Sequence, residues 1–204
     1  MSERRDDDGF TLIELVISMA LGVLVLVLLG SFFISSFQAQ STVTDTASAT
    51  SNAQLVARQL DADLRAASAV TVIDGATTES QLLIARTSRG SGTTFTCDAW
   101  LFDADAGAIL HREYANAGAA PWASNPVAWV DASATGSGWK LITEDIAPEG
   151  TADGSPVGGV FANSGDRGAV VAFELSAGHD RPPVLITTTA TGRQAYKNSE
   201  PACF

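Results

Sequence analysis

The residue types most often used in catalysis and metal binding are few in this sequence. Its 204 residues include two histidines, His111 and His179, and two cysteines, Cys97 and Cys203. Neither histidine stands at the spacing of a His/Glu or Cys/His ligand set, so each is interpreted as a surface or sheet residue. The sequence therefore indicates no enzyme, and it predicts no cofactor and no metal site.

One short motif resembles a binding loop only in part. Asp103, Asp105 and Gly107 have the first spacings of a calcium loop, but the twelfth position is Tyr114 instead of glutamate. A hairpin turn over residues 102–107 explains the same residues, because aspartate supplies side-chain caps and glycine a positive φ. We therefore interpret this motif as a turn.

Charge and length limit the remaining classes of function. The chain has 23 acidic and 12 basic residues, a formal net charge of -11. Phosphate binding requires clustered Lys and Arg, so direct nucleic-acid binding is not expected. The length allows one compact domain with an appendage.

The appendage is an uncharged apolar run at residues 15–34. About 20 residues, rising about 1.5 Å each as a helix, cover the roughly 30 Å hydrocarbon core of a bilayer. Arg4 and Arg5 precede the run and no basic residue follows before Arg58, which predicts a cytoplasmic N-terminus and a globular part outside. These features alone are typical of a signal anchor or a cleaved secretory signal.

The junction in front of the run is more specific. Residues 9–16 read Gly-Phe-Thr-Leu-Ile-Glu-Leu-Val, which closely resembles the class III signal of type IV pilins and pseudopilins. The resemblance implies cleavage after Gly9 by prepilin peptidase, N-methylation of Phe10, and retention of the apolar helix. The acidic tract at 6–8 departs from the pattern, since many leaders are basic there.

Glu14 is a carboxylate at the start of the apolar run, where an ionised group is costly and calls for a partner. In a filament of packed helices it can pair with the cationic amine of Phe10 in the neighbouring subunit, which would couple assembly to register. The alternative is a glutamate that extends to the lipid headgroups.

The helix is expected to continue to about residue 69, because residues 35–69 contain no Pro or Gly. Arg58, Asp61 and Arg65 are spaced for pairing on the solvent side. From Phe10 the helix would reach roughly 90 Å. Its predicted apolar stripe consists of Val43, Ala47, Val56, Leu60, Leu64 and Ala67.

The rest of the chain has short apolar runs separated by Gly, Asp, Asn and Pro, which indicates strands. A Gly- and Ala-rich excursion at 115–138 contains Trp122 and Trp129, which need burial or a partner. The predicted strands are 70–73, 81–86, 93–102, 108–114, 127–130, 139–146, 157–161, 169–175 and 184–191. The run at 139 could also be a short helix.

A looser resemblance covers most of the chain. Three segments look like the J-type minor pseudopilin of type II secretion and the W-type minor pilin; they are 57–67, 100–102 with 110–112, and 141–146 with 159–161. The resemblance implies a minor subunit that initiates or caps a type IV pilus or a secretion filament. Alternatives are a tip adhesin or ligand-binding module using Trp122 and Trp129, and a membrane-anchored domain unrelated to filaments.

The expected architecture is α+β, a long N-terminal helix packed on an antiparallel β-sheet domain. Four parts are predicted: a leader at 1–9, a transmembrane and filament-core helix at 10–37, an amphipathic helix at 38–69, and an extracytoplasmic β-rich domain at 70–204. Such a protein would sit in the inner membrane and enter a filament on assembly. Its implied partners are other pilin or pseudopilin subunits, prepilin peptidase, the inner-membrane assembly platform and membrane lipid.

The predicted topology places both cysteines outside the cytoplasm, where oxidation is favoured. A Cys97–Cys203 disulfide is the natural pairing and would contribute about 4 kcal/mol by closing a long loop. Two free thiols and an intermolecular bond are the alternatives.

Overall fold

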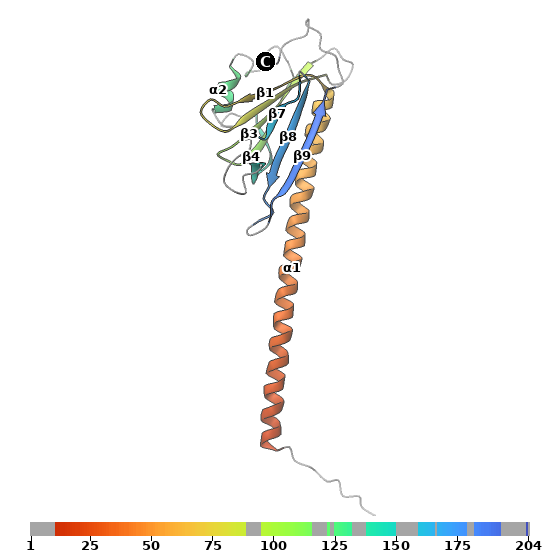
Figure 1. Cartoon of the computed structure of the whole chain (residues 1–204), viewed down its shortest axis with the longest axis vertical. Helices are drawn as coiled ribbons and strands as arrows, with labels where there is room; N and C mark the ends of the chain where they lie inside the picture. The colour runs from red at the N-terminus through yellow and green to blue at the C-terminus, as the bar shows by residue number, and fades with distance from the viewer. Residues whose placement is uncertain are drawn as a thin grey trace, which may run out of the picture. The chain divides into compact units, whose positions relative to one another are not determined.

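The computed structural model describes residues 11–88, 95–115, 122, 125–131, 138–149, 159–165, 167–178, 182–192 and 203. A long N-terminal helix is followed by antiparallel strands, which confirms the predicted α+β class (Figure 1). The chain divides into two compact units, Met1–Asp45 and Thr46–Phe204. The elements are α1 (Leu12–Ala66), β1 (Ala67–Asp74), β2 (Gln81–Ser88), β3 (Phe95–Asp103), β4 (Ala108–Tyr114), α2 (Pro126–Asp131), β5 (Lys140–Thr143), β6 (Ile146–Pro148), β7 (Phe161–Asn163), β8 (Gly168–Leu175) and β9 (Val184–Thr191).

Helix α1 ends at Ala66 instead of about residue 69, because β1 begins immediately after it. Its buried stripe differs from the prediction at its N-terminal end: Val43 and Ala47 are exposed. At 3.6 residues per turn, Ala47 lies about 180° around the helix from Val56. The buried stripe therefore lies on the face of the helix opposite to Ala47. Its members are Ala49, Ala53, Val56, Leu60 and Leu64. The predicted pairing of Asp61 with Arg65 is confirmed, at 2.6 Å.

The first sheet of the described residues is a five-stranded antiparallel meander in the order β1-β2-β3-β4-β5. The turn between β3 and β4 is the predicted hairpin. Its Asp103 Oδ1 accepts the backbone N–H groups of Asp105 and Ala106, and Gly107 has a φ of 58°. The Asp103 carboxylate therefore stabilises the turn, as the hairpin interpretation requires.

The second described sheet pairs β8 with β6 and β7, and β9 also pairs with β8. The chain enters it from the first sheet at Asp145, which has a φ of 60°. The predicted strand at 139–146 is therefore two short strands in different sheets, β5 and β6, broken where the backbone is left-handed. The predicted strand at 157–161 also differs, because β7 begins at Phe161.

The predicted strand at 127–130 is wrong, because these residues belong to helix α2. The Oδ1 atom of Asn125 accepts the backbone N–H of Ala128 at 3.3 Å, and Pro126 is the first helical residue. Asparagine at the cap and proline at the first helical position stabilise a helix start. This local chemistry outweighs the β propensity of the valines and tryptophan.

Two hydrophobic clusters cover the two faces of the five-stranded sheet in the described part of Thr46–Phe204. The first joins α1 to both sheets, through Leu60 and Leu64 of α1, Trp100 of β3 and Phe173 of β8. The second lies on the opposite face and contains Leu82, Ile84, Cys97, Ala99, Leu101, Trp122, Val130 and Cys203. The five-stranded sheet is thus covered by α1 on one face and by the region of α2 on the other.

Candidate functional site

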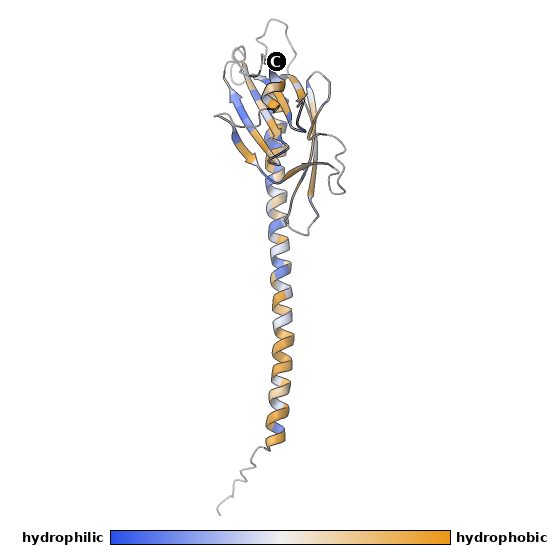
Figure 2. Ribbon diagram, turned by 90° about the vertical axis from the view of Figure 1, so that its left-hand side faces the viewer, coloured by the Kyte–Doolittle hydropathy of each residue, from blue (hydrophilic) through white to orange (hydrophobic). Residues whose placement is uncertain are grey.

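The N-terminal part of α1 exposes an unusually large apolar surface. Between Leu12 and Phe37, eighteen large apolar side chains are each at least 50% exposed within the described chain. Figure 2 shows these apolar residues following one another along the lower part of the helix. At about 1.5–3 kcal/mol for each buried side chain, covering them would contribute tens of kcal/mol.

This segment is also long and apolar enough to cross a membrane. It is apolar on all sides, unlike an amphipathic helix that packs on a single core. The surface therefore needs lipid or other apolar helices around it.

Glu14 lies in the first turn of α1. Its backbone N–H points at Thr11, with 3.3 Å to the hydroxyl oxygen and 3.1 Å to the carbonyl oxygen. Thr11 is thus the N-cap and Glu14 the third helical residue, the positions of a capping box. The sequence signal is the pattern Thr-x-x-Glu at 11–14, which the prediction from the apolar run overlooked. A negatively charged side chain in the first turn is also favoured by the positive end of the helix dipole.

The predicted cleavage and methylation residues, Gly9 and Phe10, lie outside the described residues, as does His179. The described geometry begins at Thr11. Glu14 is exposed in this chain.

The predicted disulfide between Cys97 and Cys203 is confirmed, with a Cα–Cα separation of 5.7 Å. Both cysteines are buried in the second hydrophobic cluster. The bond ties Cys203 to β3, the middle strand of the first sheet. It therefore fixes the end of the chain to the sheet core, and the free-thiol and intermolecular alternatives do not apply.

The tryptophans predicted to need burial or a partner form an aromatic cluster. Trp122 is fully buried, and its ring contacts those of Tyr114, Trp129 and Trp139. The Arg112 guanidinium lies over the Trp129 ring at 5.6 Å from its centroid, a cation–π contact. Trp122 is therefore a core residue and is not available as a surface for ligands.

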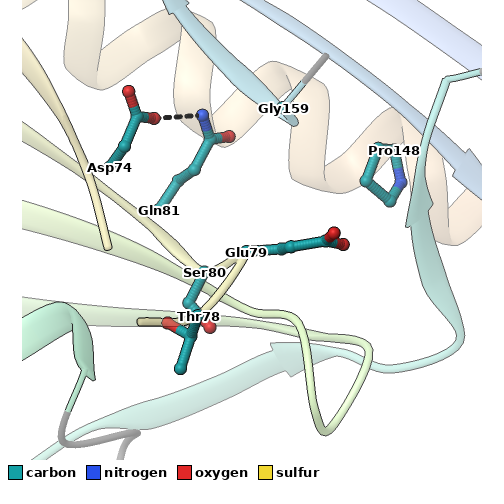
Figure 3. Close-up of a pocket in the computed structure, with 7 residues that line it drawn as sticks. All are labelled: Asp74, Thr78, Glu79, Ser80, Gln81, Pro148 and Gly159. Atoms are coloured by element: carbon teal, nitrogen blue, oxygen red, sulfur yellow. Dashed lines mark hydrogen bonds between the residues drawn. The ribbon is translucent and has the colours of Figure 1, made fainter. Parts of the chain in front are cut away.

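A cavity of about 270 Å³ lies beside the start of β2 (Figure 3). It is lined by Asp74, Thr78, Glu79, Ser80, Gln81, Pro148 and Gly159. Gln81 Nε2 donates to Asp74 Oδ1 at 2.7 Å, so one of the two carboxylates already has a partner. No histidine, cysteine or lysine is among these lining residues, and the Ser80 hydroxyl oxygen accepts the backbone N–H of Ala104 at 3.0 Å.

His111 lies on β4 as predicted for a sheet residue, but it is part of a buried polar group. Its Nε2 atom is 3.4 Å from Asp98 Oδ1 and 3.9 Å from Asp63 Oδ2. From the sequence, His111 is interpreted alone, because Asp63, Asp98 and His111 are far apart in the chain. The available signal is Asp98 itself, a carboxylate within the run at 97–102, whose other residues are apolar.

Comparison with known families gives one match, at the N-terminus. The family model for the prokaryotic N-terminal methylation motif matches residues 4–30. The match covers residues 9–16, the beginning of α1 and most of its apolar segment. No curated protein and no solved structure matches the chain.

Proposed function

We propose that this chain, which has the type IV pilin methylation motif and a pilin-like architecture, is a minor pilin or pseudopilin. In this role it would initiate or cap a type IV pilus or a type II secretion-like filament. The observation that carries the proposal is the methylation motif at residues 4–30, which includes the start of a helix whose apolar side chains are exposed on all sides. That surface suits lipid before assembly and neighbouring helices after it.

Processing is the first step of the proposed role. Prepilin peptidase would cleave after Gly9 on the cytoplasmic side, and the new amino terminus on Phe10 would be N-methylated. The domain after α1 would then lie outside the inner membrane, where the Cys97–Cys203 bond can form and persist. The assembly platform would extract the mature subunit from the lipid into the filament.

Glu14 would provide the register between subunits. In the apolar environment of packed helices its carboxylate would be costly without a partner, and the Phe10 amine of a neighbouring subunit carries the opposite charge. Pairing of the two would favour one axial position of each helix against the next. Glu14 is exposed in the isolated chain, as this pairing requires.

The minor role rests on chain length and on the loose resemblance to J-type and W-type subunits, since major subunits are usually shorter. A ligand-binding role based on Trp122 is less favoured, because this indole is buried in the second hydrophobic cluster. The extracytoplasmic domain would instead act as a structural surface against other subunits.

Quantitative mass spectrometry of sheared filaments tests this role. We expect the chain in the filament fraction at far fewer copies than the major subunit, and we expect its deletion to reduce filament number. A copy number equal to that of the major subunit would contradict the minor role. Absence from filaments, with unchanged filament number on deletion, would favour a membrane-anchored domain unrelated to filaments.

A further inference from the structure

We propose that Asp63, Asp98 and His111 form a binding site for a divalent transition-metal ion, with zinc as the ion that fits best. The three residues come from three elements: Asp63 from α1, Asp98 from β3 and His111 from β4. One donor atom from each lies within 4.8 Å of the other two. A shared ion would therefore join the helix to the five-stranded sheet.

The distances between the donor atoms favour a shared cation over direct hydrogen bonds. His111 Nε2 is 3.4 Å from Asp98 Oδ1 and 3.9 Å from Asp63 Oδ2, both beyond the usual 2.7–3.2 Å of an N–H···O bond. Within the described chain this nitrogen makes no hydrogen bond. Two ligand atoms at about 2.0–2.2 Å from a tetrahedral zinc ion are about 3.3–3.6 Å apart. The separation of His111 Nε2 and Asp98 Oδ1 already lies in this range, and the Asp63 donor would move closer around the ion.

The three side chains of this group are largely buried. The side chain of Asp98 is 0% exposed, that of His111 11% and that of Asp63 14%. Two carboxylates this close and this buried repel each other when both are ionised, and a divalent cation bound between them would offset that repulsion.

The residues around the cluster orient its ligands. Thr87 Oγ1 donates to Asp98 Oδ2 at 2.5 Å and also contacts Thr96 Oγ1 at 2.7 Å. This hydrogen bond leaves Oδ1 as the Asp98 oxygen that faces His111. The Trp100 ring lies against the imidazole, with 4.4 Å between ring centroids, and restricts its orientation. Such outer contacts are typical of residues that fix metal ligands.

The donor set selects the class of ion. One imidazole nitrogen and two carboxylate oxygens are common zinc ligands, and water completes a tetrahedral set of three protein ligands. Calcium takes six to eight oxygen ligands and magnesium prefers oxygen in octahedral geometry, so both suit this group poorly. The site differs from the proposed assembly segment and does not depend on the filament role.

The test uses the full chain in detergent micelles, stripped of metal with a chelator. Zinc is titrated in competition with a chromophoric chelator. We expect one tightly bound zinc ion, with affinity reduced more than about 100-fold in His111→Gln and Asp98→Asn. The matched control is Asp61→Asn on the same helix, which should bind as the wild type does. Equal affinity in His111→Gln and the wild type would overturn the proposal.

A second measurement uses the wild-type chain and needs no variant. In the wild-type chain labelled with nitrogen-15 on histidine, zinc should shift the His111 Nε2 resonance, and calcium or magnesium should not. An imidazole that only takes up a proton, with no response to zinc, would overturn the metal site. An equal response to calcium would overturn the assignment to transition-metal chemistry.

Discussion

Gln81 forms two hydrogen bonds with the backbone of Phe161, although the two residues belong to different sheets. Its Nε2 donates to the Phe161 carbonyl oxygen at 3.1 Å, and its Oε1 accepts the Phe161 N–H at 2.9 Å. The side-chain amide thus takes the place of a strand partner. Since Gln81 begins β2 and Phe161 begins β7, this contact joins the two sheets where β7 starts.

Gln81→Ala should lower the free energy of unfolding by about 2–4 kcal/mol. The substitution removes three hydrogen bonds, one to Asp74 and two to Phe161, and it leaves the backbone N–H and C=O of the buried Phe161 without these partners. Denaturant unfolding of the full chain in detergent measures the change. Glu79→Gln, in an exposed neighbour that lines the same cavity, should change stability by less than about 0.5 kcal/mol and serves as the control.

A double-mutant cycle tests whether the contact between Gln81 and Phe161 is the source of this stability. A Cβ at Gly159 would collide with the side chain of Gln81, so Gly159→Ala should displace that side chain from Phe161. In the Gln81→Ala background the same substitution should cost much less. If Gly159→Ala is equally destabilising in both backgrounds, the effect does not act through Gln81.

Leu60→Ala should destabilise the unit Thr46–Phe204 by about 2–5 kcal/mol. Leu60 is 0% exposed in the cluster that joins α1 to both sheets, so its truncation leaves a cavity. Leu55 is on the same helix but 60% exposed, and Leu55→Ala should cost less than about 1 kcal/mol. Thermal unfolding of both variants checks the assigned face of the helix. Similar losses in both would contradict it.

Reduction of the Cys97–Cys203 bond should lower the free energy of unfolding by about 4 kcal/mol. The cysteines are separated by 106 residues, and in the chain-entropy model a closed loop of this length strongly restricts the unfolded chain. Unfolding with and without reductant measures the effect. The Cys97→Ser/Cys203→Ser double variant should be insensitive to reductant. Recovery of two free thiols from protein made in an oxidising compartment would contradict the pairing.

The sequence predicts elements well where one local signal dominates. The strands 108–114 and 184–191 are found with the predicted bounds, because turn residues delimit a β-rich run on both sides. The prediction for 127–130 is wrong because it rests on the β propensity of these residues and not on the residues that precede them. Asn125 caps the helix and Pro126 is its first residue, and this pair indicates a helix start more reliably than the β propensity indicates a strand.

The candidate sites also differ in how far a local sequence signal identifies them. The methylation motif is contiguous, so residues 9–16 were sufficient to find it. The cluster of Asp63, Asp98 and His111 depends on how α1 packs across β3 and β4, a tertiary relationship that no local spacing encodes. The Cys97–Cys203 pair lies between these cases, because the chain has only two cysteines and their pairing needed only a shared compartment.

Glu14→Gln distinguishes a role of Glu14 in the capping box from a role of its charge in pairing with the Phe10 amine. Glutamine at the third helical position can replace glutamate in a capping box, but it has no charge to pair with the Phe10 amine. We expect normal membrane insertion and cleavage with incorporation into filaments reduced at least about tenfold. Thr11→Ala, which removes the cap and keeps the charge, is the matched control. Normal filament incorporation of Glu14→Gln would contradict a role of the charge in register.

The most direct test of the account is the intact mass of the protein purified from membranes. In cells with active prepilin peptidase, we predict loss of residues 1–9 and one methyl group on Phe10. In cells without the peptidase, the leader should remain. An uncleaved leader in the presence of the active peptidase, or cleavage after the apolar helix, would contradict the assignment as a processed pilin-like subunit.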